Sequence, residues 1–87
     1  MHERALILNL LRQVDAIAAA EGARKVTRVT VWLGALSHMS PGHFREHFAH
    51  DAAGSIAEGA ALECTASDDV ADPNATAVLL RSVEVET

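Results

Sequence analysis

The chain has 87 residues, of which 49% are hydrophobic, and a formal net charge of −5. This length suffices for one small domain near the lower limit of a self-sufficient core, and dimerisation would be one way to supplement that core. The acidic charge argues against nucleic acid as a partner, because phosphate binding needs a basic surface. No stretch approaches the roughly 20 apolar residues that span a bilayer, and polar residues interrupt the N-terminal apolar run too often for a signal peptide.

The N-terminus carries the sequence Met1-His2-Glu3, in which a histidine lies next to the α-amine. The amine of Met1, the backbone amide of His2 and its imidazole can close fused chelate rings on one metal ion. Such a nitrogen set suits square-planar Ni(II) or Cu(II), whereas zinc prefers a tetrahedral arrangement. We expect Met1 to be retained, because the aminopeptidase that removes it needs a small second residue. Any residue can occur in second position, so the tripeptide alone leaves both a metal site and an incidental histidine open.

An amphipathic helix is predicted to follow and to end at about Glu21. Its apolar residues recur at helical spacing, and charged residues occupy the rest of the circumference. The predicted apolar face consists of Leu6, Ile7, Leu10, Leu11, Val14, Ile17 and Ala18. Gly22 is a suitable C-terminal stop.

Residues 26–33 change to an alternating, β-branched pattern that predicts a strand. Two sets of residues are expected to lie on opposite faces of it, namely Val29, Val31 and Leu33 on one and Arg28, Thr30 and Trp32 on the other. A turn-rich connection follows. A second helix is predicted from about Pro41 to Ala53, with Ser40 as its N-cap and with two phenylalanines, Phe44 and Phe48, anchoring it to the sheet.

Three histidines of this second helix recur at positions i, i+4 and i+7 and therefore lie along one side: His43, His47 and His50. A pair four residues apart can chelate a metal ion on a helix, and such a site would depend on pH. The set lacks the glutamate that directly follows the first histidine in zinc proteases, so it does not predict a protease. It is compatible with a solvated polar face and with a second metal site. His38, in the preceding turn, could complete either this site or the N-terminal one, or neither.

Two further strands are predicted, over residues 61–65 and 76–86, separated by a polar, acidic segment that reads as a loop. Val83 and Val85 would face one way, with Glu84 and Glu86 facing the other. We expect these last two strands to form a hairpin. The order α-β-α-β-β then predicts an α+β fold in which two helices pack on one face of a three-stranded mixed sheet.

Several segments, taken in this order, carry a family resemblance: residues 1–3, 5–21, 22–29, 33–37, 54–63 and 82–86. Together they resemble the HypA/HybF family of nickel metallochaperones, which act in hydrogenase maturation. Each segment is weak alone, but in order they cover most of the chain. The resemblance implies a single HypA-like nickel-binding domain over residues 1–87.

The family's nickel site is built on its N-terminal Met-His-Glu, so the resemblance implies Ni(II) at Met1, His2 and Glu3. It further implies a nickel-binding accessory protein for [NiFe]-hydrogenase maturation, with a nickel-inserting GTPase and the hydrogenase large subunit as partners. A divergent interaction module that carries no metal is the alternative. No nucleophile–base constellation or glycine-rich phosphate loop is visible, so we do not expect an enzyme.

The chain also departs from the family pattern. Family members carry a zinc module with two Cys-x-x-Cys pairs between the second and third strands, where this chain has only residues 66–77, without cysteine or histidine. We therefore expect a short loop in place of the module and no zinc site. Cys64 alone cannot build a four-ligand zinc site or an internal disulfide, which fits a cytoplasmic protein. Ala35, His38 and Glu46 replace a glutamate, a glycine and an apolar residue of the family.

Overall fold

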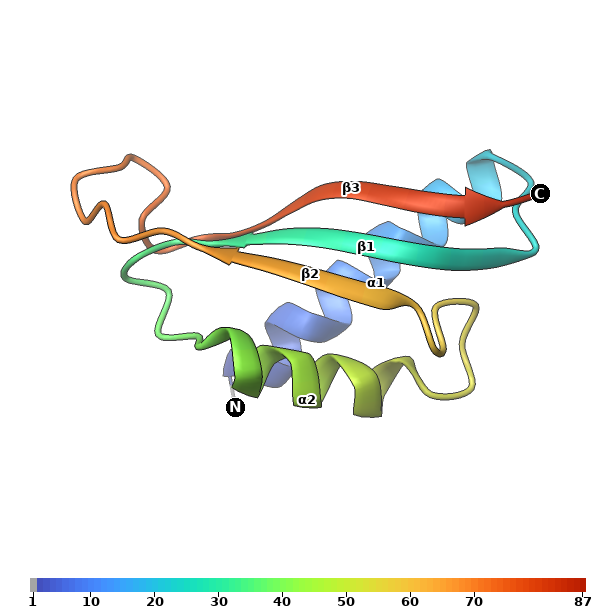
Figure 1. Ribbon diagram of the computed structural model, residues 1–87, viewed down its shortest axis with the longest axis horizontal. Helices are drawn as coiled ribbons and strands as arrows, with labels where there is room; N and C mark the ends of the chain where they lie inside the picture. Colours follow the sequence, from blue (N-terminus) through green and yellow to red (C-terminus); the bar gives the residue numbers. More distant parts are fainter. Residues whose placement is uncertain (1) are drawn as a thin grey trace.

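The computed structural model describes residues 2–87, with side chains described from Arg4 onward. Its elements are α1 (His2–Ala20), β1 (Lys25–Leu33), α2 (Pro41–Ala52), β2 (Ala61–Ala66) and β3 (Val78–Glu86). In Figure 1, α1 crosses behind the strands and α2 lies along the β2 side, and the contacts agree, since α1 touches β1 and β3 while α2 touches β2. The predicted α+β class and element order are confirmed.

The end of α1 has the geometry that its glycine predicts. The N–H of Gly22 donates to the carbonyl of Ala19 (3.1 Å), and the N–H of Ala23 donates to that of Ala18 (2.9 Å). These two bonds form a Schellman motif, whose C′ residue adopts a left-handed conformation. Gly22 has φ +64°, which a residue without Cβ adopts at little steric cost.

The start of α2 likewise follows from its sequence. Ser40 has extended backbone angles, and its Oγ accepts a hydrogen bond from the N–H of His43 at 3.3 Å, while Pro41 occupies the first helical turn. Phe44 and Phe48 are buried, and their ring centroids lie 6.2 Å apart. The predicted anchoring of this helix by its two phenylalanines is confirmed.

The three residues predicted for the inner face of β1 are buried: Val29, Val31 and Leu33. Val26 is buried as well, although strict alternation from Val29 would assign it to the opposite face. The register with β3 shifts between Val26 and Arg28, which leaves Thr27 as a bulged residue. An extra residue of this kind returns Val26 to the inner face.

The predicted hairpin between the last two strands is wrong. The sheet order is β2-β1-β3, with β2 parallel and β3 antiparallel to β1. The crossover through α2 brings β2 back parallel to β1. Residues 67–77 are more than the roughly 2–5 residues of a usual hairpin loop, and they carry the chain past the end of β1 to its other edge (Figure 1). The mixed, three-stranded character of the sheet is nevertheless as predicted.

Gly34, directly after β1, lies beneath this loop. Its N–H donates to the carbonyl of Ala77 (2.9 Å), and the N–H of Leu36 donates to that of Ala75 (2.7 Å). Gly34 is buried, and a Cβ added to it would lie 2.2 Å from the carbonyl oxygen of Ala75. The loop therefore crosses so close to the chain that only glycine fits at this position.

Both helices and the sheet contribute to one apolar core. The residues of α1 that are buried in it are Ile7, Leu10, Leu11, Val14 and Ala18. Leu6 and Ile17, also predicted for this face, are 39% and 40% exposed, because each lies about 100° around the helix from its buried neighbour. Within residues 2–87, neither helix combines the length and hydropathy needed to cross a membrane.

Candidate metal centre

The first predicted site falls at the start of α1. Met1 lies outside the described residues, and so do the side chains of His2 and Glu3. The next residue, Arg4, is described: its Nη2 lies 3.9 Å from Oδ1 of Asp51, whose side chain is only 6% exposed. The first turn of α1 is therefore held beside α2.

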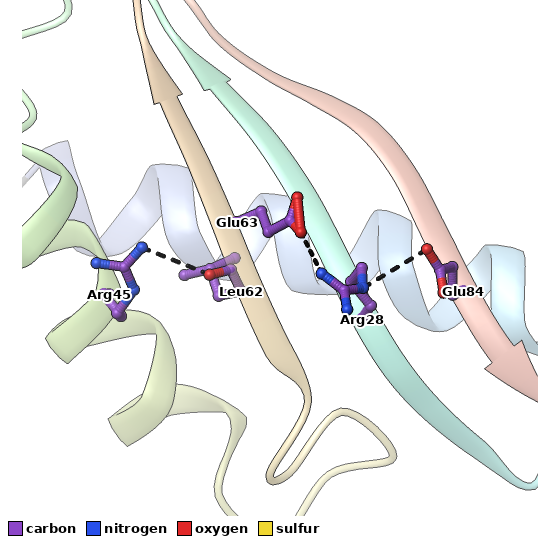
Figure 2. A network of polar contacts seen from close by, with 5 residues as sticks. All are labelled: Arg28, Arg45, Leu62, Glu63 and Glu84. Atoms are coloured by element: carbon purple, nitrogen blue, oxygen red, sulfur yellow. Dashed lines mark hydrogen bonds and ion pairs between the residues drawn. The ribbon is translucent and has the colours of Figure 1, made fainter.

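The buried face of α2, centred on Phe48, separates two flanks that contact different elements. On one flank, Nη2 of Arg45 donates to the carbonyl of Leu62 on β2 at 3.5 Å (Figure 2). On the other flank, Asp51 reaches Arg4 on α1. Residues four apart on a helix are neighbours. Positions 47 and 43, which lie four and eight residues before Asp51, are therefore on the side of α2 that faces α1, and position 43 is turned further toward solvent.

His43 and His47 occupy those two positions. Their Nε2 atoms lie 2.8 Å apart, and their ring centroids are 4.6 Å apart with an interplanar angle of 27°. A hydrogen bond between two imidazoles needs one ring to donate and the other to accept, so one of the two Nε2 atoms carries a proton and the other does not. The structure thus brings together two of the three histidines singled out on this helix.

His50, the third histidine of α2, lines an open hollow of about 200 Å³ on the surface of the helix, together with Glu46 and His47. The structure contains, among its described residues, no group of three or more His, Cys, Asp or Glu side chains that could hold a metal ion. The site of all three histidines therefore stays a prediction, and the geometry favours the pair of His43 and His47.

His38 lies exposed in the turn before α2 and has φ +62°. This left-handed conformation favours glycine, although histidine adopts it more often than most residues do. The family pattern has glycine at the position of His38, and the left-handed backbone at this position explains why glycine is favoured there.

Cys64 lies on β2, half-buried against the core. Burial raises the pKa of its thiol, and the positive charge of Arg45 opposes this by favouring the thiolate. A thiol that stays protonated is a poor nucleophile and a poor metal ligand. Cys64 is therefore suited to packing rather than to metal binding.

The solvent face of the sheet carries an ionic network that sequence reasoning missed. Arg28 on β1 pairs through Nη1 with the carboxylate of Glu63 on β2, and its Nε lies 3.6 Å from Oε2 of Glu84 on β3 (Figure 2). Only the strand order and register bring these three residues together, because Arg28 is opposite Glu84 in the antiparallel pair. Exposed pairs of this kind contribute little energy each, so the network adds only modestly to the stability of the sheet.

The sequence model of a family described as hydrogenase/urease nickel incorporation, metallochaperone, hypA, matches residues 1–74. The chain belongs to the HypA family. The match begins at residue 1 and therefore includes Met1-His2-Glu3, and it ends inside the loop between β2 and β3. The HypA resemblance inferred from the sequence is confirmed.

Curated members of the HypA family share about two fifths of their aligned residues with this chain. The hydrogenase maturation factor HypA of Chlorobium limicola is 40% identical over 63 residues, which are 72% of this chain and 54% of that protein. The HypA of Methanosarcina mazei is 42% identical over 62 residues, which are 71% of this chain and 45% of that protein. The chain thus spans about half the length of these relatives.

Solved HypA structures have the same fold. The solution structure of the Ni metallochaperone HypA from Helicobacter pylori superposes with a TM-score of 0.80 at 18% identity, covering 97% of each chain. A second solution structure of a HypA protein gives a TM-score of 0.76 at 21% identity, covering 98% of this chain and 96% of that one. At these identities the likeness establishes the fold alone.

Proposed function

We propose that this HypA-family domain binds Ni(II) as cargo at Met1, His2 and Glu3 and serves [NiFe]-hydrogenase maturation. The observation that carries the proposal is the family match, which starts at residue 1 and so includes the tripeptide. The chemistry of the tripeptide supports it, because an amine, an amide and an imidazole within two residues form the planar nitrogen set that Ni(II) prefers. Glu3 would add its backbone amide or its carboxylate, and a negative charge here also stabilises the N-terminus of α1.

The proposal treats residues 1–87 as one nickel-binding domain in which the loop near 66–77 stands in place of a zinc module. That loop contains no cysteine or histidine. It is instead organised by its own side chains, since Oδ1 of Asp69 accepts from the N–H of Ala71 and Oδ1 of Asp72 from that of Asn74. No zinc site is included in the proposal.

The expected partners are a nickel-inserting GTPase and the hydrogenase large subunit, in the cytoplasm, and the domain itself would catalyse no reaction. In the described sheet, β2 and β3 each have one outer edge. An open edge can pair with another strand, so a homodimer belongs to the same hypothesis. Light scattering over a range of protein concentrations measures whether one forms.

Calorimetric titration of Ni(II) into protein with its native N-terminus tests the site. We expect His2→Ala to remove one bound equivalent, and an extension of two residues before Met1 to remove the same equivalent by displacing the α-amine. A one-residue extension is unsuitable, because it would place the histidine third, where an amine, two amides and the imidazole again surround a metal. His50→Ala is the matched control and should leave this equivalent intact.

Retention of every nickel equivalent in both altered proteins would exclude the N-terminal site. The loss of the cysteine pairs and the substitutions at Ala35 and His38 favour the alternative, an interaction module that carries no metal. That alternative predicts no nickel bound at the native N-terminus, together with retained binding to the hydrogenase large subunit in a pull-down.

A further inference from the structure

We infer that His43 and His47 form a second metal site on α2, which binds one Ni(II) or Cu(II) ion through the Nε2 atoms of both rings. The observation is their Nε2–Nε2 distance of 2.8 Å on adjacent turns of one helix. This inference goes beyond the N-terminal site and does not depend on it.

The distance between the two nitrogens can be compared with the spacing of neighbouring ligands in metal complexes. Imidazole nitrogens bind divalent metals at about 2.0–2.1 Å, and with a separation of 2.8 Å they subtend roughly 84–89° at the metal. That is the angle between neighbouring ligands in a square-planar complex. A tetrahedral ion would need the nitrogens about 3.3 Å apart. In the metal-free pair this separation is that of a hydrogen bond, and it lies nearer to the square-planar spacing of Cu(II) and Ni(II) ligands than to the tetrahedral spacing.

The helix holds the two rings in place before a metal arrives. Phe44 and Phe48, each one residue after a histidine of the pair, are buried and fix the rotation of α2 against the core. Ser40 caps the helix at the N–H of His43, so the backbone of the first ligand is also fixed. Binding would need little further ordering of the chain, which lowers its entropic cost.

Metal binding requires a change of protonation at one ring. In a hydrogen bond between the two Nε2 atoms, the donating Nε2 carries a proton and the accepting Nε2 carries none. Coordination through both rings needs both Nε2 lone pairs, so the donating Nε2 must give up its proton before it can bind the metal. Two or more coordination positions stay open to water or to a ligand from another protein.

The pair also lies on the same side of the molecule as the start of α1. Asp51, four residues beyond His47, reaches Arg4 in the first turns of α1. A metal ion bound by the pair would thus be on the α1 flank of α2. The β2 flank, where Arg45 contacts Leu62, lies on the far side of the buried face.

The test uses the full chain with the two-residue N-terminal extension and His2→Ala, so that the N-terminal site cannot contribute. Cu(II) and Ni(II) are titrated separately by calorimetry, and the Cu(II) complex is examined by electron paramagnetic resonance for nitrogen hyperfine coupling. We expect one equivalent of either metal, lost in His43→Ala and in His47→Ala. His50→Ala is the matched control, because it removes a histidine of the same helix outside the pair. Circular dichroism verifies that each variant is folded.

Three results would overturn the inference: no binding in the extended protein, binding that survives both single substitutions, or equal loss in His50→Ala. The N-terminal proposal is tested by a different measurement, namely the nickel equivalent that protein without the extension loses on His2→Ala. The two proposals can therefore fail independently.

Discussion

Gly34 gives the sharpest test of the topology, because the whole connection between the two edge strands passes over it. A Cβ at this position would lie 2.2 Å from the carbonyl oxygen of Ala75 and 2.6 Å from that of Asn74. Both obstacles are backbone atoms, which cannot rotate away as a side chain does. Gly34→Ala must therefore displace the loop or fail to close the sheet.

The loss in the free energy of unfolding caused by Gly34→Ala can be worked out from the contacts that a shift of the loop would break. An ordinary carbon–oxygen contact requires the loop to move by about 1 Å, which lengthens the two hydrogen bonds that join Gly34 and Leu36 to the loop. Two hydrogen bonds at about 0.5–1.5 kcal/mol each, with an overpacking strain of about 1–3 kcal/mol, give a loss of about 2–6 kcal/mol. The whole domain is expected to have a free energy of unfolding of roughly 4–13 kcal/mol, so the loss is a large fraction of it.

Urea unfolding followed by circular dichroism measures this loss as a lower midpoint at unchanged slope. Gly42→Ala is the matched control, because a Cβ there meets no atom within 4 Å and lies in α2. It should be neutral or stabilise the domain by up to about 1 kcal/mol. If Gly34→Ala also changed stability by less than about 0.5 kcal/mol, the loop would not cross as described, and a β2–β3 hairpin would have to be reconsidered.

Two further substitutions test single positions. His38→Gly should raise the free energy of unfolding by about 0.5–1 kcal/mol, because the relief of the left-handed backbone outweighs the added freedom of the unfolded chain. His38→Val should lower it, because a β-branched residue adopts this backbone conformation less readily. The midpoints of urea unfolding measure both changes, and equal midpoints in the three proteins would contradict the strained φ of His38. Cys64 should react with iodoacetamide more slowly in the folded protein than in urea, because burial raises the pKa of its thiol, and Arg45→Met should slow it further. Faster labelling in Arg45→Met would refute the electrostatic role of Arg45. Since the thiol of the unfolded chain ionises at lower pH than that of the folded chain, the free energy of unfolding should fall as pH rises above the pKa of the unfolded thiol.

The elements of this fold are predictable because their signals are local. Ser40 and Pro41 predict the start of α2, and Gly22 predicts the end of α1. The alternation of β-branched residues predicts the central strand. Each signal involves residues within one turn or one strand, so tertiary structure has little opportunity to override it. Only positions at the margin of a stripe, such as Leu6, were assigned to the wrong environment.

The strand order was not predictable by the same means. A hairpin is the default for consecutive strands, but whether β2 meets β3 or β1 depends on contacts between segments far apart in the chain. The bulge at Thr27 is equally non-local, since it exists only in relation to β3. The Arg28 network follows from that register and could not be foreseen without it. One local sign was present, namely a connection too long for a simple hairpin.

The candidate metal ligands could be proposed from the sequence because their spacing is local. The proposed chelate at the tripeptide would be closed by adjacent residues, and the one at the histidine pair by one helical turn, so neither needs long-range register. What the structure adds is selection: of the three histidines on α2 it brings His43 and His47 within 2.8 Å, while His50 lines the neighbouring hollow.

The openness of the proposed histidine site bears on the role of a carrier. A structural zinc site is closed by four protein ligands and holds its ion permanently. A two-nitrogen site on an exposed helix leaves positions free, so a receiving protein can add its own ligand before the first bonds break. Exchange through such an intermediate avoids releasing the ion to water. The same openness would make a poor permanent cofactor site. If nickel is the cargo of this domain, a pair such as His43 and His47 is therefore suited to passing it on.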